Sequence, residues 1–89
     1  PEQVKAAVDA QSAVRVTWEG NSQGVKHYIV YRSRDGAAPV AVASPPGDVQ
    51  EFIDDRLPGN GTYTYSVRAS GLDGSLSAES RSASVTYAR

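Results

Sequence analysis

The stretch Leu57-Pro58-Gly59-Asn60-Gly61-Thr62-Tyr63-Thr64-Tyr65-Ser66-Val67-Arg68-Ala69 decides the fold of this chain. Its first five residues are rich in Pro, Gly and Asn, which is typical of a turn. After the turn, every second residue is apolar or aromatic, so these residues share one side of an extended strand. They are Tyr63, Tyr65, Val67 and Ala69. The stretch therefore predicts a turn leading into a half-buried β-strand, from Thr62 to Ser70.

The same period-2 alternation recurs along the chain, and no window shows a sustained helical stripe. Six further strands are predicted between clusters of turn residues: Val4–Val8, Val14–Trp18, Lys26–Ser33, Pro39–Ala43, Gln50–Asp54 and Ala78–Tyr87. The residues expected to point inward are Val4, Ala6, Val8, Val14, Val16, Trp18, Phe52, Ala83, Val85 and Tyr87. The dipeptide Asp35-Gly36 predicts a tight turn. Seven short strands predict an all-β sandwich.

Composition limits the classes of protein to which this chain can belong. Its 89 residues are enough for one domain, and it has no Cys and therefore no disulfide. The net charge is −1, from nine basic and ten acidic residues without a basic block, so we expect no nucleic-acid partner. No apolar run approaches the length of a membrane helix, so we expect no membrane insertion. Because the sequence has no Met and starts at Pro1, we interpret residues 1–89 as a single domain excised from a larger protein.

Several motifs together resemble a fibronectin type III domain, of the kind found in bacterial secreted multidomain enzymes and surface proteins. They are Trp18 on the second strand, Leu57 and Tyr63 around the turn, the phrase Tyr28-Ile29-Val30-Tyr31-Arg32-Ser33, and Phe52-x-Asp54-x-x-Leu57. The resemblance implies a seven-stranded antiparallel Greek-key sandwich with Trp18 in its core. It also implies that Leu57 and Tyr63 form a tyrosine corner, in which the Tyr hydroxyl bonds to upstream backbone.

The resemblance implies a function without chemistry of its own. We expect a non-catalytic spacer or docking module of a secreted or cell-surface bacterial protein, such as a polysaccharide-degrading enzyme. Its partners would be neighbouring domains of the same chain, and the isolated module would be a monomer without a cofactor. Two alternatives stay open. One is a module that recognises a protein or glycan through the loops Gly20–Gly24 and Gly71–Ser75 or through an outer sheet face, and the other is a structural repeat of an adhesin or phage tail.

Residue types that could carry catalysis or bind metal are sparse. His27 is the only His, and no nucleophile or orienting group accompanies it, so we interpret it as a surface residue. Four acidic residues lie close in sequence: Asp48, Glu51, Asp54 and Asp55. Their spacing does not match a calcium loop, and we interpret them as solvated charges, with Asp54 or Asp55 accepting bonds from turn amides. The sequence therefore predicts no enzyme activity, no catalytic residue and no metal site.

The third strand carries the candidate binding face. If Tyr28 and Val30 point inward, Ile29 and Tyr31 point outward, where an exposed aromatic ring suits a neighbouring domain or a sugar. Such pairs also stabilise a solvated sheet without binding anything, and we favour that interpretation. Arg32 falls on the inward parity, so we expect its stem to pack and its charged head to reach water at the sheet end.

Overall fold

A computed structural model describes residues 2–9, 13–19, 24–77, 80 and 82–88 of the chain. It has seven strands: β1 (Glu2–Val8), β2 (Val14–Glu19), β3 (Val25–Arg34), β4 (Val40–Ala43), β5 (Glu51–Asp54), β6 (Gly61–Gly71) and β7 (Ala83–Tyr87). In the described part of the chain, no helix has the length and apolar character needed to span a bilayer. The fold is all-β, as the alternation in the sequence predicted.

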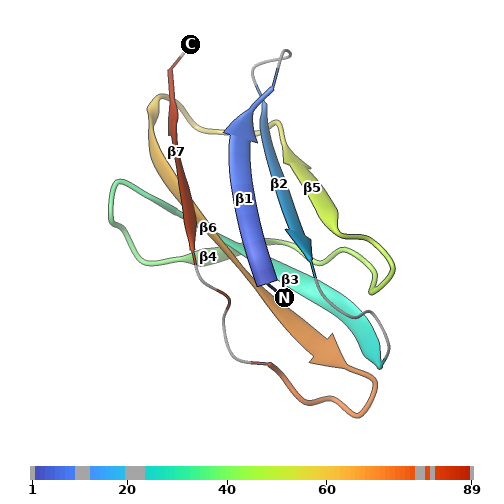
Figure 1. The fold of residues 1–89 in the computed structure, drawn as a ribbon. Coiled ribbons are helices and arrows are strands. Elements are labelled where there is room, and N and C mark those ends of the chain that lie inside the picture. Colours follow the sequence, from blue (N-terminus) through green and yellow to red (C-terminus); the bar gives the residue numbers. More distant parts are fainter. Residues whose placement is uncertain (1, 10–12, 20–23, 78–79, 81, 89) are drawn as a thin grey trace.

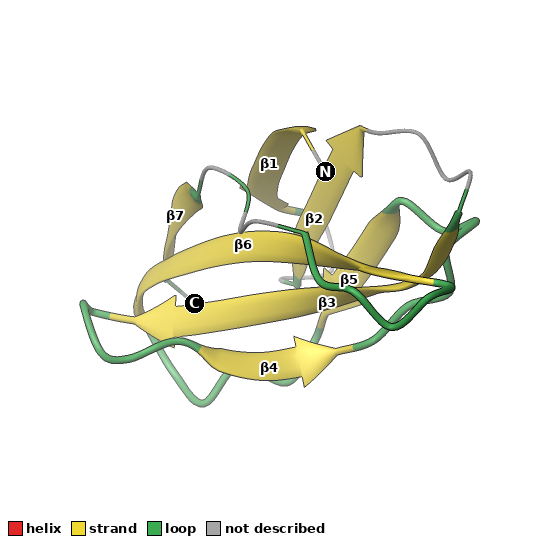
Figure 2. Ribbon diagram, turned by 90° about the horizontal axis from the view of Figure 1, so that it is seen from below, coloured by secondary structure: helices red, strands yellow, loops and turns green. Residues whose placement is uncertain are grey.

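Two antiparallel sheets face each other (Figures 1 and 2). The three-stranded sheet has the order β1-β2-β5, and the four-stranded sheet has the order β4-β3-β6-β7. On one side of the sandwich β1 packs beside β7, and Figure 1 shows the two strands running in the same direction. The other side is bordered by β4 and β5, the remaining edge strand of each sheet.

The core is built from the inward residues of both sheets. The apolar and aromatic strand residues below 5% exposure are Val14, Val16, Trp18, Tyr28, Val30, Tyr63, Tyr65, Val67 and Tyr87. Phe52 and Leu57 are partly buried and pack against this cluster. Burial of these aliphatic and aromatic side chains is the main stabilising term of a chain this small, which has no disulfide.

The predicted tight turn after β3 is present. Asp35 and Gly36 have positive φ angles of 51° and 82°, and the amide of Ala37 donates to the carbonyl of Arg34 at 3.0 Å. Two successive positive φ angles define the mirror-image turn whose twist matches a hairpin. Asp35 and Gly36 suit it because Asp tolerates this backbone region and Gly has no Cβ to strain.

Two predicted details differ from the structure at strand ends. Val8 was expected to point inward, but it is 41% exposed, because it is the last residue of an edge strand that turns at Asp9. The last strand begins at Ala83 rather than Ala78, although residues 78, 79 and 81 lie outside the described residues. In the segment before β7, side-chain hydroxyls take the place of backbone carbonyls as acceptors for β6. The amide of Val67 donates to the hydroxyl of Ser80 at 2.8 Å, and the amide of Ala69 donates to the hydroxyl of Ser77 at 2.9 Å.

Candidate functional site

The turn before β6 is fixed by Tyr63. Its side chain is fully buried, and its hydroxyl donates to the carbonyl oxygen of Gly59 at 2.6 Å. The guanidinium groups of Arg32 and Arg34 lie 5.8 and 5.9 Å from the centre of the Tyr63 ring, which places both within cation–π range. Arg34 also donates to the carbonyl of Asn60 at 2.6 Å. The turn is thus tied to β3 as well as to its own strand, which suits a structural role.

Trp18 lies at the centre of the core. It is 2% exposed, and its ring meets the ring of Tyr28 edge-on, with centroids 5.3 Å apart. Edge-to-face packing of this kind adds stabilisation beyond the buried area. This residue joins β2 of one sheet to β3 of the other and is remote from solvent, so its role is packing.

The outer face of the four-stranded sheet carries Ile29 and Tyr31. The register places Tyr31 opposite Ser66 and Ile29 opposite Arg68. The Arg68 guanidinium lies 5.8 Å from the centre of the Tyr31 ring, and both Ile29 and Tyr31 are half-buried. One face of the Tyr31 ring is therefore already occupied by Arg68, which resembles ordinary cross-strand cover. A binding role for this face stays a prediction.

The four neighbouring acidic residues separate in the structure. Asp48 and Asp55 are exposed, Glu51 pairs with Arg15 on the outer face of the three-stranded sheet, and Asp54 is buried. Within the described ranges, no group of three or more His, Asp or Glu side chains is placed to hold a metal ion.

The two loops proposed for recognition are joined by a hydrogen bond, in which the amide of Leu72 donates to the carbonyl of Gly24 at 3.0 Å. His27 is half-buried at the start of β3, opposite Ser70. In the loop after β6, Ser75 donates to Asp73 through its amide (3.0 Å) and hydroxyl (2.7 Å), and these bonds lower the pKa of Asp73. The loop Gly20–Gly24 lies outside the described residues except for Gly24.

The prediction for Arg32 was wrong in one respect. Its head does not simply reach water: the side chain is 18% exposed, and Nη1 donates to Oδ2 of Asp54 at 2.8 Å. The same oxygen accepts a bond of 2.8 Å from the hydroxyl of Tyr65, and Oδ1 lies 3.4 Å from the amide of Arg56. Asp54 is 3% exposed, so a charge in this position requires such partners. This buried network links β3, β5 and β6.

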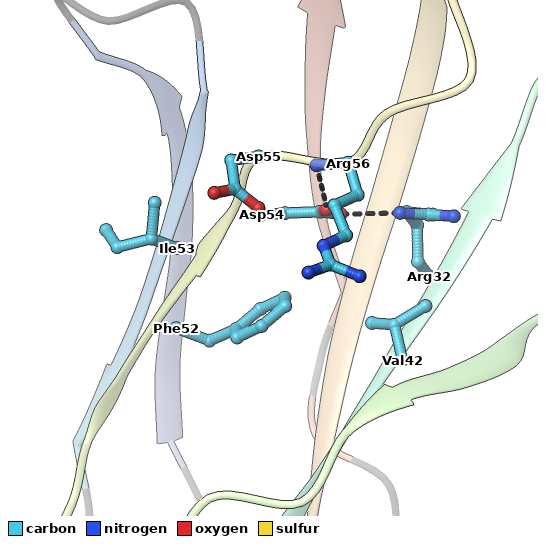
Figure 3. Close-up of a pocket in the computed structure, with 7 residues that line it drawn as sticks. All are labelled: Arg32, Val42, Phe52, Ile53, Asp54, Asp55 and Arg56. Carbon is cyan, nitrogen blue, oxygen red and sulfur yellow. Dashed lines mark hydrogen bonds and ion pairs between the residues drawn. The ribbon is translucent and has the colours of Figure 1, made fainter.

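A cavity of about 340 Å³ lies beside this network, at the side of the sandwich bordered by β4 and β5 (Figure 3). Its lining residues are Arg32, Val42, Phe52, Ile53, Asp54, Asp55 and Arg56. The apolar part of the wall comes from inward residues of both sheets, and the polar part comes from the network and the segment after β5. No sequence motif pointed to this cavity.

Because of this network, we expect the protein to become less stable at alkaline pH. Burial, and next the hydrogen bond to Asp54, raise the pKa of the Tyr65 hydroxyl far above its usual value near 10. Above about pH 10 an unfolded tyrosine loses its proton while folded Tyr65 keeps it, so unfolding releases a proton. The free energy of unfolding should therefore fall as pH rises above about 10, and fall less steeply in Tyr65→Phe. Urea denaturation of both proteins from pH 8 to 11 measures this, and parallel curves would contradict it.

No family model matches the chain, and no curated protein sequence matches it. Solved structures do. An Fn3-like protein from Clostridium thermocellum superimposes with a TM-score of 0.81 at 23% identity, covering 100% of this chain and 92% of that one. A pectate lyase from Pectobacterium carotovorum (TM-score 0.78, 21% identity) matches 93% of this chain but only 26% of the lyase. A beta-1,2-glucanase from Parabacteroides distasonis (0.75, 24%) matches 98% of this chain and 13% of the glucanase. The fold is therefore that of a fibronectin type III-like domain.

Proposed function

We propose that residues 1–89 form a non-catalytic spacer module, with Greek-key connectivity, of a larger extracellular protein that acts on polysaccharides. The main support for this proposal is the arrangement of β1 and β7, which run side by side in the same direction (Figure 1). The chain therefore enters and leaves the sandwich at opposite ends of this strand pair. A strand of seven residues spans about 23 Å, which sets the scale of the separation between flanking domains.

The context of the similar structures supports the extracellular setting and the polysaccharide connection. In the pectate lyase and the glucanase, the matching part covers a small fraction of a much longer chain. A module attached to such a chain acts by fixing geometry, because it changes the effective concentration of one domain's ligand at another domain. This proposal requires no catalytic residue or cofactor in the module, which is a monomer when isolated.

The spacer role is tested by deletion and replacement in the parent protein. Deleting the module should leave turnover of a small soluble substrate nearly unchanged, since the catalytic domain is untouched. Activity on an insoluble polymer should fall, because two domains must engage one surface together. An unrelated rigid domain of similar length should restore most of the loss. If it restores nothing while Tyr31→Ala or Ile29→Ala reproduces the deletion, the module binds through its outer face and is not a spacer.

A further inference from the structure

The turn that enters β6 contains an Asn-Gly pair, Asn60-Gly61. Asn60 is exposed, and Gly61 is the first residue of β6. In such a pair, the main-chain nitrogen of the glycine can attack the side-chain amide of the asparagine before it, because a glycine has no Cβ to obstruct the approach. This reaction needs no enzyme, so its rate depends on the groups that surround the pair.

Charged groups of the turn after β3 lie against Gly61. A Cβ added to this glycine would lie 3.0 and 3.1 Å from the two carboxylate oxygens of Asp35, and 3.1 Å from Nε of Arg34. A larger residue would therefore crowd both side chains, so a glycine fits this position. The Asn-Gly pair is thus held beside a carboxylate and a guanidinium group.

The Arg34 guanidinium group is placed to activate the attacking nitrogen. That nitrogen reacts after it loses its proton, and its negative charge spreads onto the carbonyl oxygen of Asn60, since the two atoms belong to one peptide group. Nη2 of Arg34 donates to this oxygen at 2.6 Å. A charge-assisted bond that is already in place stabilises negative charge that develops on an oxygen. The ring of Tyr63, 5.9 Å from the guanidinium carbon, helps to hold Arg34 in this position.

We propose that Asn60 is a site of spontaneous chemical modification, at which the folded protein loses a side-chain amide and forms isoaspartate. The nitrogen of Gly61 forms a bond to Cγ of Asn60, and the bond from Cγ to the side-chain nitrogen breaks. The proton lost by the attacking nitrogen balances the one that the side-chain nitrogen gains when it leaves as ammonia. Water then opens the five-membered imide. Aspartate results when the bond from Cγ to the glycine nitrogen breaks, and isoaspartate results when the bond from the main-chain carbonyl carbon breaks.

Isoaspartate would disturb the turn, because its main chain runs through Cγ and is one carbon longer. The added carbon lies between two anchored groups. The carbonyl of Gly59 accepts the hydroxyl of Tyr63 at 2.6 Å, and the amide of Thr62 donates to Oδ1 of Asp35 at 2.9 Å. This inference goes beyond the spacer role, because it concerns how long the module keeps its native turn. It depends only on residues 34–63, so it is tested on the isolated chain.

The test is incubation of the isolated chain at mildly alkaline pH, with and without urea, followed by digestion and mass spectrometry of the peptide that contains Asn60. We expect the folded chain to react no more slowly than the unfolded chain, because the contact with Arg34 exists only in the fold. Arg34→Gln should slow the reaction of the folded chain by about threefold or more, since the charge-assisted bond is lost.

Two further variants separate the charge of Arg34 from its packing. Arg34→Lys keeps a positive charge and should keep most of the rate, whereas a purely structural role would make Lys and Gln equivalent. Arg15→Gln removes the same charge from the outer face of the three-stranded sheet and should react like the wild type.

Three results would overturn the proposal. The first is a folded chain that reacts more slowly than the unfolded chain, because the fold would then protect Asn60. The second is an unchanged or faster reaction in Arg34→Gln while its spectrum shows a folded protein, because the guanidinium group would then not activate the pair. The third is loss of the amide with aspartate as the sole product, which would mean that water attacks the side chain directly and that the nitrogen of Gly61 takes no part.

Discussion

Asp54→Asn should lower the free energy of unfolding by about 3 kcal/mol, because it breaks a buried ion pair. The change keeps the size of the side chain but leaves the Arg32 guanidinium, 18% exposed, without its counter-charge. The hydroxyl of Tyr65 also keeps a weaker acceptor in place of a carboxylate. This expected loss of stability is at the low end of the usual range for breaking a buried ion pair, because the Arg32 side chain is partly exposed to solvent at the cavity. Urea denaturation at neutral pH measures it.

The matched control is Asp55→Asn, one residue further along. It removes the same charge from an exposed side chain that makes no hydrogen bond or ion pair with a described residue, so we expect a change under about 0.5 kcal/mol. In the Asp54→Asn background, Arg32→Met should cost less than it does in the wild type, since the two residues act as one unit. Equal denaturation midpoints for the two Asn variants would show that the buried pair contributes nothing to stability.

Tyr63→Phe should lower the free energy of unfolding by about 1 to 3 kcal/mol. The phenylalanine fills the same buried space, but the carbonyl of Gly59 loses its 2.6 Å donor. Cation–π contact with Arg32 and Arg34 is retained in a Phe ring, so the change isolates the hydroxyl.

Tyr31→Phe is the comparison for this variant. The same hydroxyl is removed, but from a half-buried ring on the outer sheet face, so the expected cost is under about 0.5 kcal/mol. Thermal or urea unfolding of both variants, measured under the same conditions, compares the two losses of stability. If the Tyr31 variant is the less stable of the two, the turn before β6 is not held by Tyr63.

Most of the fold could be predicted because burial follows the period of a strand. Every second residue of β2 and β6 is apolar or aromatic, and those residues are the ones that the core buries. Strand ends were less predictable, because they depend on local hydrogen bonds. The start of β7 follows Ser77 and Ser80, whose hydroxyls accept backbone bonds in a way that propensity does not reveal.

The candidate site was harder to predict, because its residues come from three strands distant in sequence. The alternation of inward and outward positions along the strands did contain a clue to the ion pair. Arg32 shares the inward side of β3 with Tyr28 and Val30, and Asp54 shares the inward side of β5 with Phe52. Two opposite charges on inward positions indicate a buried ion pair, since a lone buried charge is too costly. The cavity beside that pair could not be predicted from the sequence, because its size depends on the distance between the edges of the two sheets.

The parallel run of β1 and β7 has a mechanical consequence. If neighbouring domains are drawn apart while attached to a moving polymer, tension enters at the start of β1 and leaves at the end of β7, along the strands. Each of these strands is held by an antiparallel ladder, β1 to β2 and β7 to β6, whose hydrogen bonds lie across the direction of pull. Such a load is shared by many bonds at once instead of opening them one by one, so the module is suited to carry force between its neighbours without unravelling.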